Sequence, residues 1–94
     1  MSWTLTILSR AEKDLRSVPA AARAEVRDHI RQLGEDPWPA GVVKLRGGQR
    51  SLYRIRVDDF RVIYDVDEAR RVVRVVAVGN RRHVYARLAR RELD

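Results

Sequence analysis

The chain has 94 residues, with 20 Lys and Arg against 13 Asp and Glu, a formal charge of +7 and a pI near 11.0. This length predicts one domain over residues 1–94, the 45% hydrophobic fraction excludes a disordered tail, and the absence of cysteine excludes disulfides and thiolate metal sites. The N-terminus lacks a signal-peptide pattern and no apolar run approaches the ~20 residues of a membrane helix, so we expect a cytoplasmic protein.

The N-terminal part of the chain predicts one strand followed by two helices. Apolar residues alternate over residues 3–8, which indicates a short strand. Ser9 and Glu12 have the spacing of a capping box, so a helix should begin at Ser9. Pro19 favours the start of a second helix, and Gly34 favours its end. Apolar residues recur at helical spacing in both segments: Ala11, Leu15 and Val18, then Ala22, Val26, Ile30 and Leu33.

The C-terminal part predicts a sheet and a last helix. After a loop over residues 40–50 come three runs with strand character: Leu52–Val57, Phe60–Val66 and Val72–Val78. The expected turns are residues 58–59 and 67–70, and Gly79 and Asn80 should end the last strand. The segment 81–93 should form a helix, with Val84, Leu88 and Tyr85 as the candidates to face inward.

The order β-α-α-β-β-β-α predicts an α+β fold with a mostly antiparallel sheet. A sheet of this size must bury one face, and the helical hairpin is expected to be its only cover. The other face should then stay open to solvent or to a ligand.

A two-residue turn over 58–59 would determine how the first two long strands pair. It would place Arg56 opposite Arg61 and Arg54 opposite Ile63, with the apolar side chains on the other face. Like charges directly opposed cost about 0.2–1 kcal/mol, which a polyanionic ligand or solvent screening would relieve. Functional use of this basic face and an incidental solvated face both remain possible interpretations.

Further cations precede these strands: Lys44, Arg46 and Arg50. From Lys44 to Arg56 there are five cations and no acid, and 18 of the chain's 20 cations are arginine. Arginine binds phosphate oxygens bidentately, so this excess favours a nucleic-acid partner. A GC-rich genome would also favour arginine over lysine, but it does not explain the net excess. Asp65 shares the predicted arginine face, where it could orient a guanidinium or be solvated.

A second group of polar residues follows the last strand: Arg81, Arg82, His83 and Tyr85. If Asn80 caps the terminal helix, Arg81 and Tyr85 are i and i+4 neighbours. An arginine neutralises phosphate charge and a tyrosine hydroxyl can exchange a proton, although Tyr85 could instead pack on the sheet. His83 could be an acid or base, or a surface histidine. No residue spacing predicts a metal site or a cofactor.

The segments KLRGGQRSLYRIRVDDFRVIYDVD and VVRVVAVGNRRHVY resemble the RelE/ParE toxin superfamily, and the likeness extends over nearly the whole chain. The resemblance implies the toxin of a type II toxin–antitoxin system. RelE-like members that cleave RNA enter the ribosomal A site, where the ribose 2′-hydroxyl of the messenger attacks the adjacent phosphate without a metal. It also implies an antitoxin with a flexible, often acidic segment that wraps the basic face.

The resemblance also implies residue roles. Arg54 and Arg56 match the basic pair on the first long strand, where lysines are common, and Arg61 matches the arginine that stabilises the phosphate. Arg81 matches the arginine associated with the leaving group, and Tyr85 matches the tyrosine implicated in activating the 2′-hydroxyl.

Other residues are expected to support these five. His83 is the substitute base, and Arg82 is a possible auxiliary residue. Phosphates of the ribosome or the messenger would be held by Lys44, Arg46 and Arg50. The alternatives are a ParE-like toxin that inhibits DNA gyrase, and an inactive module that only binds an antitoxin.

Overall fold

A computed structural model describes residues 2–45 and 51–93 of the protein. Its elements are β1 (Thr4–Ile7), α1 (Ser9–Ser17), α2 (Ala20–Leu33), β2 (Val43–Lys44), β3 (Leu52–Val57), β4 (Phe60–Asp67), β5 (Val72–Asn80) and α3 (Val84–Leu93). The predicted order is confirmed, with the short strand β2 added inside the expected loop 40–50. None of the described helices is long and apolar enough to span a membrane.

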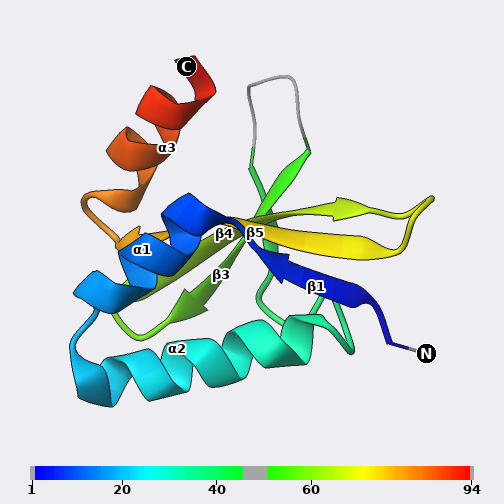
Figure 1. The fold of residues 1–94 in the computed structure, drawn as a ribbon, viewed down its shortest axis with the longest axis horizontal. Helices are drawn as coiled ribbons and strands as arrows, with labels where there is room; N and C mark the ends of the chain where they lie inside the picture. Colours follow the sequence, from blue (N-terminus) through cyan, green and yellow to red (C-terminus); the bar gives the residue numbers. More distant parts are fainter. Residues whose placement is uncertain (1, 46–50, 94) are drawn as a thin grey trace.

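The five strands form one sheet in the order β1-β5-β4-β3-β2. β1 runs parallel to β5, and every other neighbouring pair is antiparallel. The prediction of a mostly antiparallel sheet is therefore confirmed. Figure 1 shows α1 and α2 on one side of the sheet and α3 on the other. The strands β3, β4 and β5 therefore lie between two helical layers.

The larger core lies between the helical hairpin and the sheet. The predicted apolar stripes of α1 and α2 contact the side chains that β3, β4 and β5 direct to this face: Ile55, Val57, Val62, Tyr64, Val73, Val75 and Val78. Each fully buried aliphatic side chain here contributes about 1.5–3 kcal/mol. The Tyr64 hydroxyl donates to the Pro37 carbonyl at 2.6 Å, and burial raises the pKa of Tyr64 far above its ordinary value.

The ends of the two hairpin helices differ in part from the prediction. The capping box was wrong, because Ser9 is already helical and the preceding Leu8 has no side-chain oxygen to cap α1. Glu12 instead pairs with Arg27 of α2. At the other end of α1, the Arg23 guanidinium donates to three backbone carbonyls, those of Leu15, Arg16 and Val18. Gly34 follows α2 at its C-terminal end, as predicted.

The predicted register of the β3–β4 hairpin is confirmed at every pair. Val57 lies opposite Phe60, Arg56 opposite Arg61, and Arg54 opposite Ile63. Asp58 in the turn has φ of +53°, in the left-handed region that aspartate tolerates better than most residues. The two-residue turn therefore places three arginines on one face of the sheet.

The β4–β5 hairpin is longer than predicted at both ends. β4 continues to Asp67, so the turn occupies residues 68–71, and β5 continues through Gly79 to Asn80. The extra residues remain in the ladder because Asn80 lies opposite Phe60 at the end of the β3–β4 hairpin. An irregularity in the pairing beside Ile63 shifts the register of β5 by one residue.

The expectation of an open second face was wrong. Helix α3 covers part of it, and a smaller core forms there from Leu52, Ile63, Val76, Ala77 and Val84, with Leu45 and Leu88 against it. The register shift in β5 explains how the adjacent Val76 and Ala77 both join this core. Val84 and Leu88 point inward as predicted, one helical turn apart. What remains uncovered is the arginine-bearing part of β3 and β4.

Candidate active site

A contact between Arg54 of β3 and Tyr85 of α3 forms the centre of the site. The Arg54 Nη1 donates to the Tyr85 hydroxyl oxygen at 3.3 Å, across 31 positions of the chain. Tyr85 is 39% exposed, because Val84 and Leu88 take the inward positions of α3. The hydroxyl thus lies beside a cation and remains accessible to a ligand.

Arg54 is held in an unusual environment for a cation. Its side chain is half-buried, and its Nε is buried without a hydrogen-bond partner in the described structure. Leaving a buried donor unpaired costs about 1–3 kcal/mol. A guanidinium in this situation gains more from a nearby anion than a fully hydrated one does.

Arg61 is more deeply placed than a surface ligand-binding arginine. It is only 8% exposed, and its Nη1 donates to the carbonyls of Asp58 and Phe60, both at 3.1 Å. These bonds fix the guanidinium at the hairpin turn and leave Nε and Nη2 as donors. Arg56, directly opposite on β3, is exposed.

Arg81 reaches the same end of the sheet by a route that differs from the prediction. Its backbone N–H donates to the Asp59 carbonyl at 2.9 Å, in the β3–β4 turn. The Asn80 side chain accepts from the N–H groups of Arg82 and His83, both at 3.0 Å. Residues 81–83 therefore form a turn and α3 begins at Val84, so the expected i, i+4 pairing of Arg81 with Tyr85 within a helix was wrong.

The side chains of this turn are open to solvent. Arg81, Arg82 and His83 are all exposed, and none of the three contributes to either core. The structure thus gathers Arg56, Arg61 and Arg81 around the end of the β3–β4 hairpin. Arg54 lies further from this turn on β3, where it contacts Tyr85 of α3.

The arginines of this cluster form no ion pair in the described structure, although Asp58 and Asp59 form the turn beside them. Across the described residues, no Asp or Glu lies within ion-pair distance of the site arginines Arg54, Arg56, Arg61, Arg81 and Arg82. Asp65, the acid on this face, is buried and accepts from Arg74 Nε at 2.9 Å, an interaction that raises the pKa of Arg74. Of its two expected roles, Asp65 therefore has the first, orienting a guanidinium. The remaining field is positive and favours an anionic ligand.

A cavity beside β3 adds residues that the sequence did not single out. Arg54 and Arg56 line it together with His29 and Gln32 of α2 and the loop over residues 39–41. The i, i+3 spacing of His29 and Gln32 places both on one side of α2, which the sequence does show. Nothing in the sequence shows that this side of α2 borders β3.

The structure describes one of the three predicted phosphate-holding residues. Lys44 is exposed on β2 and lies opposite Tyr53, whose side chain packs against the hairpin core. Paired residues point to the same face, so Lys44 projects from the face of the sheet opposite to that of Arg54 and Arg56. Arg46 and Arg50 lie outside the described residues.

Metal-binding groups were not predicted from the sequence. Within residues 2–45 and 51–93, no three His, Asp or Glu side chains are close enough to hold a metal ion.

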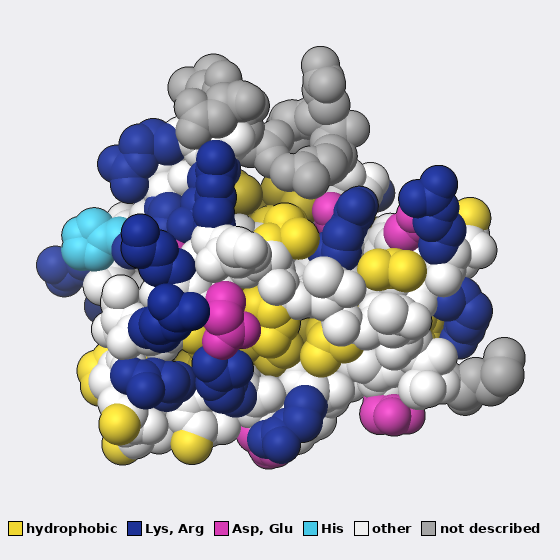
Figure 2. Space-filling view, viewed as in Figure 1, with side chains coloured by type: hydrophobic (Ala, Val, Ile, Leu, Met, Phe, Trp, Pro, Cys, Tyr) yellow, Lys and Arg dark blue, Asp and Glu magenta, His cyan; other side chains and the backbone are white. Residues whose placement is uncertain are grey.

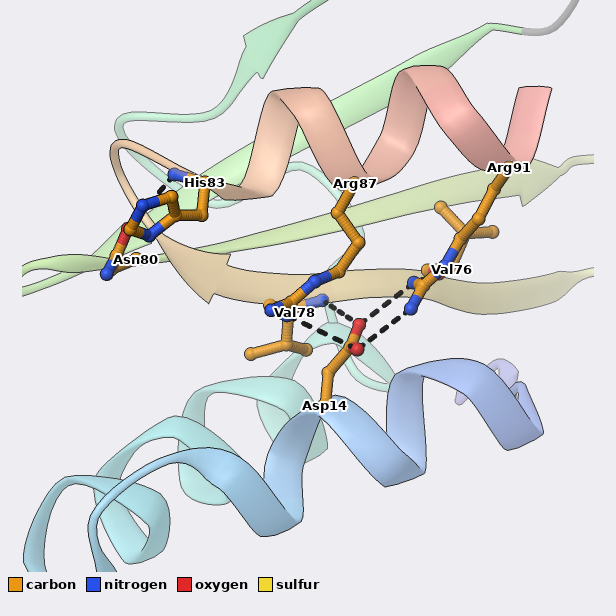
Figure 3. A network of polar contacts seen from close by, with 7 residues as sticks. All are labelled: Asp14, Val76, Val78, Asn80, His83, Arg87 and Arg91. Carbon is orange, nitrogen blue, oxygen red and sulfur yellow. Dashed lines mark hydrogen bonds and ion pairs between the residues drawn. The ribbon is translucent and has the colours of Figure 1, made fainter. Parts of the chain in front are cut away.

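A buried carboxylate on α1 holds the helix that carries Tyr85 (Figure 3). Asp14 is 7% exposed and accepts from Arg91 Nη1 and Nη2 at 2.9 and 2.8 Å. It also pairs with Arg87 Nη1 at 3.3 Å and accepts from the Val78 N–H at 3.0 Å. This group, which we call the Asp14 clamp, consists of Asp14, Arg87 and Arg91.

The clamp also completes the edge of β5. β1 ends opposite Val75, so the backbone beyond that residue has no neighbouring strand on that side. Arg91 donates to the Val76 carbonyl at 2.9 Å and Arg87 to the Val78 carbonyl at 2.7 Å. These side chains thus replace the missing strand and fix α3 against β5 and α1. One signal in the sequence could have revealed the clamp, since Asp14 lies three residues after Ala11 on the apolar side of α1.

The chain is similar in sequence and in fold to proteins of type II toxin–antitoxin systems. Residues 5–85 match the model of a family described as the ParE toxin of the type II toxin–antitoxin system parDE. No curated protein sequence matches the chain significantly.

Several solved structures have the same fold. A chain in the archaeal RelE–RelB complex from Pyrococcus horikoshii OT3 is 30% identical, with a TM-score of 0.75 over 89% of this chain and 100% of that one. A mutant of the Escherichia coli toxin RelE in the free state is 28% identical, with a TM-score of 0.74 over 97% of this chain and 98% of that one. A chain of the Mycobacterium tuberculosis complex RelBE2, at 22% identity and a TM-score of 0.76 over 86% of this chain and 100% of that one, shares the fold.

Proposed function

Because the chain belongs to the RelE/ParE superfamily of type II toxin–antitoxin toxins, we propose that it is a cytoplasmic endoribonuclease that cuts messenger RNA in the ribosomal A site. The observation that carries this proposal is the Tyr85 hydroxyl beside Arg54, in a cluster of arginines that form no ion pair with an acid among the described residues. A proton-exchanging group next to fixed cations is what phosphodiester cleavage by a neighbouring hydroxyl requires.

In the proposed reaction the RNA supplies its own nucleophile. The 2′-oxygen bonds to the adjacent phosphorus, the bond from phosphorus to the 5′-oxygen breaks, and a 2′,3′-cyclic phosphate remains. Tyr85 accepts the 2′-hydroxyl proton on its phenolate oxygen, with His83 as the substitute base. Negative charge develops on the 5′-oxygen as its bond to phosphorus breaks; Arg81 stabilises this charge, and the oxygen then takes a proton from water.

The remaining cations stabilise the phosphate. Arg61 donates from Nε and Nη2 to the equatorial oxygens, with its guanidinium held at the turn by two carbonyls. Arg54 and Arg56 add charge from β3. Because arginine stays protonated in proteins, these residues act by hydrogen bonding and charge, and not as bases.

We also propose the partners that this reaction and family imply. Solved RelE proteins of similar fold are in complex with RelB, and we expect a cognate antitoxin whose flexible, acidic segment covers the basic face. The messenger and ribosome are the proposed targets, with Arg82 as an auxiliary contact. Phosphates of either RNA would be held by Lys44 on β2 and by Arg46 and Arg50.

A second candidate function follows from the matched family model. That model describes ParE toxins, and ParE-like members poison DNA gyrase and generally lack the RNA-cutting residues. Arg61, Arg81 and Tyr85 together favour the ribonuclease. An inactive antitoxin-binding module would share the fold and the charge but have neither activity.

The test is primer extension on a defined messenger incubated with the purified protein, with and without programmed ribosomes whose A site is empty. We expect a cut at the A-site codon only when ribosomes are present. Cutting of naked RNA would remove the ribosome from the mechanism. No cutting in either condition, with inhibition in a gyrase supercoiling assay, would establish the ParE-like alternative.

Tyr85→Phe tests the role of the hydroxyl in the same assay. The ring stays and the proton-exchanging group is lost, so the single-turnover rate should fall by about 10²–10⁴-fold. A near-normal rate would show that Tyr85 only stacks against a base. His83→Gln in the same assay tests the substitute base.

A further inference from the structure

A second basic surface lies on the other side of α3 from the candidate site. It is a groove between α1 and α3 with a volume of about 420 Å³, lined by Arg10, Lys13, Asp14, Ser17, Arg87, Arg90 and Arg91. Figure 2 shows Lys and Arg side chains gathered over α1 and α3 on this face. The described lining contains five cations and one carboxylate, an excess of positive charge that favours an anionic ligand.

The single carboxylate does not neutralise the groove. Asp14 is fully occupied by the clamp, in which two arginines already outweigh its charge. Lys13 and Arg90 are exposed, and neither makes an ion pair within the described structure. Their charges are therefore not used by the fold, and they stand on opposite walls of the groove.

We propose that this groove binds the phosphodiester backbone of structured RNA, away from the strand that is cut. The lining side chains are all charged or polar, including the Ser17 hydroxyl. Phosphate oxygens need only charge and hydrogen-bond donors, which this surface supplies. An acidic protein segment that folds on binding would also need pockets for anchoring apolar side chains, and no aliphatic or aromatic residue is among the lining residues of the groove.

The position of the groove gives the bound RNA a defined relation to the candidate site. Tyr85 is on one flank of α3, beside β3, whereas Arg87 and Arg91 are one turn apart on the flank that faces α1. The two surfaces share a helix but no residue. RNA in the groove would hold the protein on a structured RNA while the other flank engages the scissile phosphate.

The proposal rests on the proposed function for its choice of RNA, and its test measures binding without cleavage. The probe is a fluorescently labelled RNA hairpin whose 2′-hydroxyls are all methylated, so that the proposed reaction cannot consume it. Its dissociation constant is measured for the full chain by anisotropy between about 50 and 200 mM salt. A DNA hairpin of the same sequence and polyglutamate are measured in parallel.

The test variant is Lys13→Gln with Arg90→Gln, and the matched control is Arg31→Gln with Arg70→Gln. The control removes the same charge from side chains that are 72% and 83% exposed and lie outside the groove. The salt slope of RNA binding should fall by about 0.9 for each phosphate that the test variant no longer binds, and stay near that of the wild type in the control. Thermal melts check that both variants fold.

Equal slopes for the two variants would overturn the proposal, because the weaker binding would then reflect net charge alone. A change confined to polyglutamate would assign the groove to an acidic protein, and a change confined to the DNA hairpin would assign it to DNA. If the test variant has a lower salt slope for RNA binding but the wild-type protein cuts no messenger, the groove is upheld as an RNA-binding site and the proposed function is rejected.

Discussion

The arginines on the two flanks of α3 have opposite environments. On the α1 side, Arg87 and Arg91 share the buried carboxylate of Asp14 and also bond backbone carbonyls of β5. On the β3 side, Arg54 has a buried Nε without a partner, and no carboxylate approaches it in the described structure. One group of cations is bound to a carboxylate and holds the fold together, whereas the other has no ion-pair partner in the described structure.

This difference shows how one residue type serves two purposes in so basic a chain. A buried carboxylate in an ion pair keeps its favourable energy only when both of its oxygens are bonded, which is the case for Asp14. A half-buried cation without a counter-charge makes the free protein less stable, and an anionic ligand offsets that cost. Sites of this kind commonly exchange stability for activity.

Among the changes that test this comparison, the largest effect should come from Arg54→Gln, which removes the uncompensated charge. The single-turnover cleavage rate should fall by about 10²–10³-fold, because a preorganised donor beside Tyr85 is removed. The free energy of unfolding should stay the same or rise, since the buried unpaired Nε is also removed. Single-turnover assays and urea denaturation measure the two quantities.

A large loss of stability in Arg54→Gln would contradict the contrast between Arg54 and the arginines of the Asp14 clamp, because it would show that Arg54 also stabilises the fold. Arg54→Lys is the matched control. It keeps the charge and should retain more of the cleavage rate than the glutamine variant.

The converse change is Asp14→Asn, which breaks the clamp. Two arginines would be left near the β5 edge without their counter-charge, so the free energy of unfolding should fall by about 3 kcal/mol. Urea denaturation followed by circular dichroism measures this.

Glu12→Gln is the matched control for the clamp. It breaks the pair between Glu12 and Arg27, whose side chains are 33% and 41% exposed, and should cost less than about 1 kcal/mol. If both variants lost the same free energy of unfolding, the burial of Asp14 would not make the clamp more stabilising than an exposed ion pair.

An effect smaller than that of the clamp is expected in the hairpin core, away from both groups of arginines. Tyr64→Phe removes the hydrogen bond to the Pro37 carbonyl and should lower the free energy of unfolding by about 1 kcal/mol. Because the folded pKa of Tyr64 is raised, its stabilisation is complete below the unfolded pKa of ~10 and is lost as the pH rises further. The wild type should therefore lose stability above that pH, and the phenylalanine variant should lack this part of the loss. Parallel pH dependences in urea denaturation would contradict it.

The sequence by itself determined the parts of the molecule that follow local periodicity. The alternation in residues 52–57 and 60–66, with a two-residue turn between them, was enough to pair Arg56 with Arg61 and to place the arginines on one face. A slip of one residue would have buried those charges, so only one register is compatible with a core. The apolar stripes of α1 and α2 were predictable for the same reason, because a period of 3.6 identifies the buried side of a helix.

Only the tertiary structure decided which distant groups meet. The prediction joined Tyr85 to Arg81 because they are close in sequence, yet the asparagine side chain at position 80 forms a turn and Tyr85 contacts Arg54 instead. The covering of the second sheet face by α3 and the Asp14 clamp likewise depend on where helices dock. Such contacts join positions 31 to 77 residues apart. They are set by the packing of whole elements, and no local pattern in the chain records them.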